Sequence, residues 1–416
     1  MNYLFVVLSA ALFFIMPGCS PSSPTVKKTV SAPMVQLGNE NFLQNYLHLT
    51  KNKRVGILTN PSGVDRNLVS IVDILHNRRD INVTALFAPE HGIRGDYYAG
   101  SHVENQRDER TGLPVYSLYG DSRKPGKDML ENVDAIIVDI QDIGLRPYTY
   151  VYTMAMVMQA AAEFGKEVIV LDRPNPIGGV QVEGNPVQEG YFSFVGLYPV
   201  PYRHGMTIGE LAKLFNEEYD IHCRLTVVPV LNWRRRMHWD QTGLPWVAPS
   251  PHVPTWETIL QMISTGAIGE LQTVSVGVGY TLPFKLIGAP WMDGQRFADA
   301  LNRLDLPGVR FRPLFYKPFY SLFKGELCQG VQLHITDRNA YRPYHTGLMI
   351  MRVLLDQYPQ QNIFAGKDRR KMFDKVVGCS YIANDLLAGK SVAEIEAKWQ
   401  QELADFMQIR QKYLLY

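Results

Sequence analysis

The chain has 416 residues, of which 46% are hydrophobic and 20% are charged, a composition typical of a folded globular protein and not of a disordered one. Its 42 basic and 40 acidic side chains give a formal net charge of +2, and this balance argues against a nucleic-acid-binding protein. Because one core seldom serves a chain of this length, two domains are expected.

The N-terminus reads as a targeting segment. The apolar run from Leu4 to Met16 has the length of a signal-peptide core and is too short to span a membrane as a mature helix. Cys19 and the serines and prolines after it resemble a bacterial lipoprotein signal, in which the cysteine is acylated. We therefore predict a signal over 1–19 ending at the anchor Cys19, a flexible tether over 20–38, and a periplasm-facing lipoprotein of the cell envelope. An ordinary cleaved secretory signal is the alternative.

From about residue 39 the hydrophobic pattern alternates between strands and helices. Strands are predicted over 54–59, 82–87, 133–139, 167–172 and 225–229, and helices over 68–78, 150–164 and 208–219. The near-continuous apolar run at 133–139 is typical of a strand buried on both faces of a parallel sheet. The alternation predicts an α/β fold, with a Rossmann-like doubly wound sheet over 39–235 that carries the catalytic loops.

Beyond Trp233 the composition of the sequence changes: prolines and tryptophans cluster, and strand and helix patterns no longer alternate regularly. We predict a smaller α+β domain over 236–416 that closes a cleft against the first domain. Its predicted elements are strands over 273–278 and 331–336, a helix over 347–357 and a charged amphipathic helix over 392–412.

Polar side chains follow the predicted strand 82–87. Glu90, His91 and Arg94 lie where the carboxyl end of a strand meets a loop, which is where doubly wound sheets bind ligands. A carboxyl group in this position is suited to general acid catalysis, so Glu90 is the first catalytic candidate. The alternatives are that Glu90 pairs with Arg94 to brace the turn, and that His91 is a base, a substrate donor or a structural loop residue.

A second group follows the strand 133–139 and comprises Asp139, Asp142, Arg146 and Tyr148. Glycosidases commonly flank the scissile bond with two carboxyl groups about 5 to 9 Å apart, so Asp142 is the candidate partner of Glu90 and Asp139 a candidate substrate-binding residue. The alternative is structural, with one aspartate capping the next helix and the other pairing with Arg146.

A third group surrounds the strand 167–172 and comprises Asp172, Arg173, Asn175 and His204. Arg173 suits an anionic group, although an Asp172–Arg173 pair that pins the loop is an equal alternative. Thr207 and Glu210 have the spacing of a capping box before a helix, and His204 lies just outside it as a candidate ligand.

No cofactor is expected. The first strand is followed by no Gly-x-Gly-x-x-Gly, and no phosphate-binding Gly-x-x-x-x-Gly-Lys-Ser/Thr occurs in the chain. The candidate histidines and carboxylates come from separate loops without the spacing of a metal site. Cys223, Cys328 and Cys379 are widely spaced and odd in number, so buried free thiols are predicted.

Six stretches together resemble the NamZ-type exo-β-N-acetylmuramidases: FAPEHGIRG (87–95), TGLPVYSLYG (111–120), DIQDIGLRPYTY (139–150), LDRPNP (171–176), HGMTIGE (204–210) and PFKLIGAPW (283–291). The resemblance covers roughly residues 40–410. It implies a Rossmann-like domain followed by a smaller domain, and release of N-acetylmuramic acid from the non-reducing ends of peptidoglycan fragments. The proposed catalytic glutamate of the family corresponds to Glu90.

The implied sugar carries a lactyl carboxylate, for which Arg94, Arg146 and Arg173 are the expected partners, and Tyr148 and Tyr150 are expected to stack on its ring. The sequence departs from the family pattern in its C-terminal half, where His252, Val278 and Lys285 replace asparagine, arginine and glutamate. These departures keep a second hypothesis open, a non-catalytic lipoprotein that binds peptidoglycan sugars. Metal-assisted hydrolysis is a third.

Overall fold

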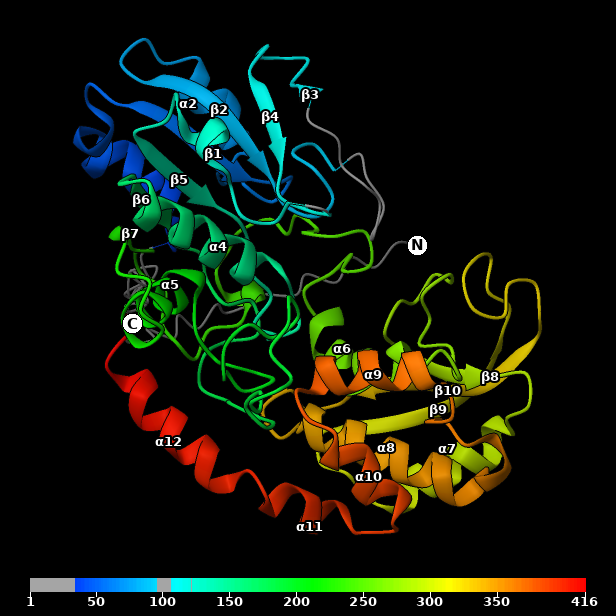
Figure 1. Cartoon of the computed structure of the whole chain (residues 1–416). Helices are drawn as coiled ribbons and strands as arrows, with labels where there is room; N and C mark the ends of the chain where they lie inside the picture. The colour runs from blue at the N-terminus through cyan, green and yellow to red at the C-terminus, as the bar shows by residue number, and fades with distance from the viewer. Residues whose placement is uncertain (1–33, 96–105, 121) are drawn as a thin grey trace, which may run out of the picture. The chain divides into compact units, whose positions relative to one another are not determined.

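Seven strands from residues 54–228 form a mixed sheet in the computed structural model, which describes residues 34–95, 106–120 and 122–416 (Figure 1). The strands are β1 (Arg54–Thr59), β2 (Asn82–Ala88), β3 (Gln106–Arg107), β4 (Pro114–Ser117), β5 (Ala135–Asp139), β6 (Glu167–Leu171) and β7 (Arg224–Val228). Their order is β3-β4-β2-β1-β5-β6-β7, and every neighbouring pair is parallel except β3 with β4. The predicted Rossmann-like sheet is confirmed, and its strand order reverses at β1, between β2 and β5.

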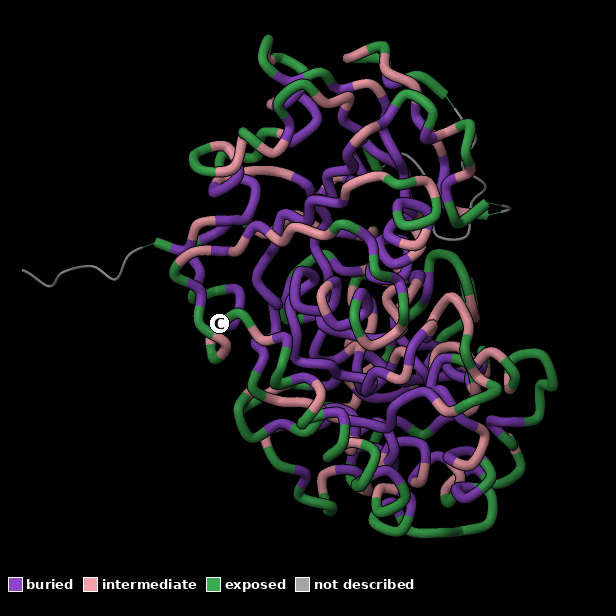
Figure 2. The backbone as a smooth tube through the Cα atoms, turned by 60° about the vertical axis from the view of Figure 1, so that its left-hand side comes forward, coloured by how far each residue is buried: buried purple, intermediate pink, exposed green. Residues whose placement is uncertain are grey.

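Helices cover both faces of this sheet. They are α1 (Gly38–Asn41), η1 (Phe42–Tyr46), η2 (Leu47–Thr50), α2 (Ile71–His76), α3 (Lys127–Leu130), α4 (Tyr150–Glu163) and α5 (Ile208–Glu218). Because successive strand residues point to opposite faces, Ile136 and Val138 of β5 join the core beneath α4 and α5, whereas Ala135 and Ile137 join the core beneath η1 and α2. Buried residues run through the interior of the fold, and exposed residues lie mainly in its outer loops (Figure 2).

A second, three-stranded antiparallel sheet has the order β8-β10-β9. Its strands are β8 (Leu286–Ala289), β9 (Val309–Tyr316) and β10 (Cys328–Ile335), and its helices are α6 (Thr258–Glu270), α7 (Gly294–Arg303), α8 (Pro343–Gln357), α9 (Lys367–Val377) and α10 (Tyr381–Leu387), with short turns η3 (Trp239–Gln241) and η4 (Pro359–Gln361). On β9, Phe311 is buried while Arg310 and Arg312 are exposed, so one face of this sheet carries the core. The smaller α+β domain is thereby confirmed, while its predicted boundary at 235/236 stays a prediction.

The long helix predicted over 392–412 is wrong as a single element. It is divided into α11 (Val392–Ala397) and α12 (Gln400–Gln411), because the buried Trp399 turns between them to pack edge-on against Tyr344. The tail then returns to the first sheet, where the Tyr416 hydroxyl donates to Asp172 at 2.6 Å. The end of the chain is therefore part of the packing around β6.

The strand predicted over 273–278 is also wrong, because only an isolated bridge between Ser275 and Gly288 forms there. Alternating valines suggested a strand, but Gly277 and Gly279 take positive φ angles of 84° and 92° that interrupt extended backbone.

The helix predicted over 68–78 is shorter than expected. Leu68 has a φ of 64°, and Ser70 caps the helix by accepting from the Val72 backbone N–H at 3.3 Å, so α2 begins only at Ile71.

The predicted anchor Cys19 and the rest of the signal lie outside the described residues. Residues 34–38, assigned to the tether from sequence, pack on the fold, with Val35 and Leu37 buried and Gln36 bridged to Leu231. None of the helices in residues 34–95, 106–120 and 122–416 has the length and hydropathy needed to cross a membrane.

Candidate active site

Three strand-end loops converge on Glu90. Glu90 follows β2, Tyr119 follows β4, and Thr149 ends the loop after β5, so the parallel strands deliver all three to the same edge of the sheet. The Thr149 hydroxyl donates to Glu90 Oε2 at 3.1 Å. The Tyr119 hydroxyl also hydrogen-bonds Glu90. The partly buried carboxyl group is therefore held by two hydroxyl donors.

A tight turn aims Glu90 at this cluster. The Gly92 backbone N–H donates to the Pro89 carbonyl at 3.1 Å, which places Glu90 and His91 at the centre of the turn. His91 has a φ of 74°, the left-handed conformation that the third position of a type II turn requires. A non-glycine residue held there stores of order 1 kcal/mol of backbone strain, a cost often found at functional loops.

Tyr119 stays protonated over the physiological range. Burial, the charge of Glu90 and the hydrogen bond with Glu90 raise the pKa of Tyr119 to about 12, and the nearby Arg123 opposes them. A neutral phenol is a hydrogen-bond donor, so Tyr119 orients the Glu90 carboxyl group and does not compete with it as a base.

Two tyrosines of the loop after β5 join the cluster. The Tyr148 and Tyr150 rings meet edge to face with centroids 4.7 Å apart, and burial followed by nearby groups, Glu90 among them, raises the pKa of both. The Tyr150 hydroxyl donates to the Pro249 carbonyl at 2.5 Å, and Asn60 donates to the same carbonyl at 3.5 Å. The segment around Pro249 is thereby fixed beside the Glu90 cluster.

His252 lies three residues after Pro249, on the segment that Tyr150 fixes, and burial followed by the charge of His91 lowers the pKa of His252. The His252 Nε2 atom is 2.9 Å from the Tyr320 hydroxyl, and the two rings stack with centroids 6.3 Å apart. The departure at His252 noticed in the sequence is thus on the segment held beside the Glu90 cluster.

Arg94 braces the loop around Glu90. Its guanidinium group binds Asp108 at 2.9 Å and Asp73 at 3.1 Å while its side chain stays partly exposed. Burial would raise the pKa of Asp108, but hydrogen bonds from Arg94 and Thr111 outweigh it and lower that pKa. Two carboxylates already match the charge of Arg94, and its predicted role toward the substrate carboxylate stays a prediction.

The other two arginines are enclosed. Arg146 is fully buried and donates to three backbone carbonyls, those of Asn185, Val200 and Val376, at 2.6, 3.0 and 2.8 Å. Pairing between Arg146 and an aspartate, the structural alternative from sequence, is wrong. Arg173 instead binds Asp139 at 2.6 Å, with both side chains almost completely buried.

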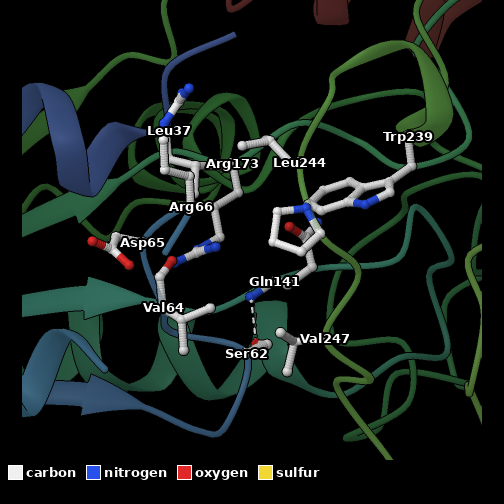
Figure 3. Close-up of a pocket in the computed structure, with 11 residues that line it drawn as sticks. Leu37, Ser62, Val64, Asp65, Arg66, Gln141, Arg173, Trp239, Leu244 and Val247 are labelled. Carbon is white, nitrogen blue, oxygen red and sulfur yellow. Dashed lines mark hydrogen bonds between the residues drawn. The ribbon is translucent and has the colours of Figure 1, made fainter. Parts of the chain in front are cut away.

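A small pocket beside Arg173 lies at the ends of β1, β5 and β6, where Ser62 and Gln141 meet beneath Trp239 (Figure 3). The Ser62 hydroxyl accepts from the Gln141 backbone N–H at 3.1 Å. Its cavity of about 10 Å³ holds at most one water molecule. A sugar ring therefore has no room in this pocket.

Asp142 forms a buried pair with His204. The two side chains approach to 3.3 Å between Asp142 Oδ2 and His204 Nε2, and the same oxygen accepts from the Gly144 N–H at 2.7 Å. The Met206 N–H donates to His204 Nδ1 at 3.1 Å, so in the neutral imidazole the proton is on Nε2 and faces Asp142. Asp142 thus holds the loop after β5 against the segment before α5.

Asp172 and Asn175 anchor the start of α5. Asp172 accepts from the Gly209 N–H at 2.7 Å and from the Thr207 hydroxyl at 2.8 Å, and Asn175 donates to the Met206 carbonyl at 2.9 Å. The predicted capping box of Thr207 with Glu210 is confirmed.

Of the residues predicted as site residues, the structure brings Glu90, His91 and Tyr148 together, and places Asp139, Arg146, Asp172, Arg173, Asn175 and His204 in buried structural contacts. Sequence reasoning did not single out Tyr119, Thr149 or Asn60. Tyr119 and Thr149 lie within two of the quoted motifs. Their positions were the available signal, because Tyr119 is two residues after β4 and Thr149 directly precedes α4.

Within the described part of the chain, no group of three or more His, Cys, Asp or Glu side chains is arranged to hold a metal ion. Cys223, Cys328 and Cys379 are buried free thiols, as predicted, and burial is the main cause that raises the pKa of each.

Comparisons with known proteins match one family over most of the chain. The family models for the N-terminal and C-terminal parts of exo-β-N-acetylmuramidase NamZ match residues 55–257 and 262–416. The chain is 46% identical over 414 residues, 99% of each sequence, to the peptidoglycan β-N-acetylmuramidase NamZ of Bacillus subtilis (strain 168).

Two crystal structures of DUF1343 family proteins from Bacteroides fragilis NCTC 9343 are similar. One has a TM-score of 0.88 at 45% identity and the other 0.73 at 31%, each covering 92% of this chain and 99% of its own.

Proposed function

Because the chain belongs to the exo-β-N-acetylmuramidase NamZ family, we propose that it is a glycoside hydrolase that releases N-acetylmuramic acid from the non-reducing ends of peptidoglycan fragments, with Glu90 as the general acid. The observation that carries the assignment is the convergence of three strand-end loops on the Glu90 carboxyl group, which Thr149 and Tyr119 hold by hydrogen bonds.

In the proposed reaction Glu90 donates its proton to the glycosidic oxygen as the bond from that oxygen to the anomeric carbon breaks. Water then adds to the anomeric carbon and its proton returns to the enzyme, so the net change is hydrolysis of one bond. Tyr119 and Thr149 fix the direction of the Glu90 carboxyl group, which matters because proton transfer requires a donor within hydrogen-bond reach of the oxygen.

Replacing Glu90 with glutamine tests the assignment through the leaving group. For a saccharide leaving group, which needs protonation, we expect kcat/KM to fall on the order of 10² to 10⁴. For an aryl β-N-acetylmuramide with an acidic phenol as leaving group, the loss should be much smaller. Equal losses on both substrates, or full activity of the variant on the saccharide, would refute the general-acid role. Glu189→Gln at an exposed position is the matched control.

Three groups are candidates for the second catalytic role beside Glu90. Asp142 was the candidate from sequence, and its buried pairing with His204 supports a role in holding the loop that carries Tyr148 and Thr149. A tyrosine beside Glu90 and the acetamido group of the substrate are the other candidates. The anomeric configuration of the first-formed product, followed by NMR, separates a retaining from an inverting course.

Arg123 is a better-placed partner for the lactyl carboxylate than the three arginines named from sequence. It is exposed, its guanidinium lies over the Phe194 ring at 4.2 Å, and its charge acts on Tyr119 beside Glu90. Arg123→Gln should raise KM for N-acetylmuramides more than for N-acetylglucosaminides, which lack the lactyl group. An unchanged preference would remove Arg123 from the site.

The cell-envelope location rests on the sequence signal around Cys19. If Cys19 is acylated, the wild-type protein incorporates a labelled fatty acid in the producing bacterium and partitions into detergent, and Cys19→Ser does neither. Labelling of the Ser variant at the wild-type level would exclude Cys19 as the anchor.

A further inference from the structure

The end of β9 and the loop that joins it to β10 (Figure 1) form the segment 315–327, which is called the aromatic loop below. Several of its apolar side chains are exposed. The exposed fractions are 67% for Phe315, 65% for Phe319, 50% for Tyr320 and 57% for Leu327. Single exposed apolar residues are ordinary, but several on one short segment indicate a binding surface.

The aromatic loop is held in place by specific contacts. The Phe319 ring stacks on Tyr280 with centroids 5.7 Å apart and an interplanar angle of 25°, and the Phe319 N–H donates to the Gly279 carbonyl at 2.7 Å. A Cβ atom added to Gly279 would lie 2.0 Å from the Tyr320 carbonyl oxygen, so only glycine permits this approach. The exposed rings are therefore presented in a fixed orientation, which reduces the entropy lost on binding.

The aromatic loop is also connected to the Glu90 loop. Tyr320 hydrogen-bonds His252 at 2.9 Å and stacks on its ring. His252 lies three residues after Pro249, whose carbonyl accepts from the Tyr150 hydroxyl, and Tyr150 follows Thr149, which donates to Glu90. A ligand that extends from Glu90 past His252 therefore reaches Tyr320, and Phe319 is the neighbour of Tyr320 in the chain.

We propose that Phe319 and Tyr320 form a platform for the second and later sugar residues of the leaving chain, counted outward from the bond that is cleaved. This inference rests on the proposed function, because an exo-acting enzyme holds the terminal sugar at Glu90 and the rest of the chain must leave outward. Pyranose rings carry flat patches of C–H groups that pack on aromatic faces, and sugar hydroxyls accept and donate hydrogen bonds at the rim of such a surface.

The charges of the loop agree with a saccharide occupant. Lys317, Lys324 and Glu326 mix both signs, so the surface lacks the one-sided positive charge that binding to an anionic membrane would use. Continuity with the Glu90 loop through His252 also distinguishes a substrate surface from a contact with a second copy of the chain.

The test compares chain lengths. Phe319→Ala and Tyr320→Ala should raise KM about 5- to 20-fold on a tetrasaccharide of alternating N-acetylmuramic acid and N-acetylglucosamine, with kcat little changed, because uniform binding is lost. On the disaccharide the change should be under about twofold. Phe319→Tyr should restore the tetrasaccharide KM. Phe192→Ala, an exposed phenylalanine outside the aromatic loop, is the control.

Equal effects of Phe319→Ala on both saccharides, or no effect on either, would overturn the platform. So would an unchanged tetrasaccharide KM together with loss of vesicle binding or of self-association in sedimentation. Failure of the proposed function is distinct from these outcomes, because the wild-type protein would then release N-acetylmuramic acid from neither saccharide.

Discussion

The difference in unfolding free energy between the wild type and an Asp172→Asn variant should depend strongly on pH between acid and neutral solution. Asp172 is fully buried, and its two oxygens accept four hydrogen bonds, from the backbone N–H groups of Arg173 and Gly209 and the hydroxyls of Thr207 and Tyr416. Burial raises the pKa of Asp172 to about 6, against the opposing hydrogen bond from Tyr416. Asparagine fits the same contacts, because Oδ1 can keep both N–H donors and the two hydroxyls can rotate to accept.

The magnitude follows from proton linkage. An unfolded aspartate has a pKa of about 3.9, so the folded state binds this proton about two pKa units more tightly, which corresponds to about 3 kcal/mol. The stabilisation is fully present below about pH 4 and is lost as the pH rises through about 6. Asparagine has no proton to lose. The free energy of unfolding of the wild type, relative to Asp172→Asn, should therefore fall by about 2 kcal/mol between pH 4 and pH 7, since at pH 4 about half of the unfolded aspartate is already ionised.

Urea unfolding of both proteins at five pH values measures this difference, and all other titrating groups cancel because both proteins contain them. Asp305→Asn, at an exposed position, should show a nearly constant difference. A constant difference for Asp172→Asn as well would refute the reasoning. Activity measurements show whether Asp172 also binds substrate. The kcat/KM of Asp172→Asn should stay within a fewfold of wild type, and a tenfold rise in KM would support the substrate-binding role predicted from sequence.

Three further outcomes are expected. Arg146→Ala should lower the free energy of unfolding by about 3 kcal/mol or more, because three buried carbonyls lose their donor, whereas the exposed Arg312→Ala should change it by less than about 0.5 kcal/mol in the same urea assay. Asp142→Asn should lower the melting temperature but keep kcat/KM within about tenfold, and a loss beyond 10² would instead support its catalytic role. Dialysis against a chelator should leave kcat/KM unchanged, because the proton donation proposed for Glu90 needs no metal, and activity that disappears and returns with a divalent ion would contradict this.

The sequence predicted the first sheet well because its signals are local. The buried run at 133–139 and the capping residues Thr207 and Glu210 determine their elements with little help from the rest of the fold. The second sheet was predicted poorly. β9 contains Pro313 and alternates with arginines, and it becomes a strand because it pairs along its whole length with β10. Such pairing is a tertiary contact, which local patterns do not contain.

The site was predicted in part for a related reason. Strand-end position correctly indicated the edge of the sheet, but it applied equally to Glu90, Asp139 and Asp172. These residues differ in their partners: Asp139 forms an ion pair with Arg173, and Asp172 accepts a hydrogen bond from the C-terminal Tyr416. Those partners come from other strands or from the far end of the chain, so no spacing in the sequence reveals them.

The edge of the first sheet where the parallel strands end therefore has two parts, which differ in how far their polar groups are buried. Around β6 the polar groups are buried in mutual contacts, the cavity beside Arg173 admits no more than a water molecule, and the tail from α12 closes over Asp172. Around β2 and β4 the Glu90 carboxyl group stays partly exposed and meets hydroxyl donors. Buried charge pairs hold a fold in one geometry but cannot exchange protons with a ligand they never touch. The proposed proton donor, Glu90, therefore lies on the β2 side, where its carboxyl group is oriented without being enclosed.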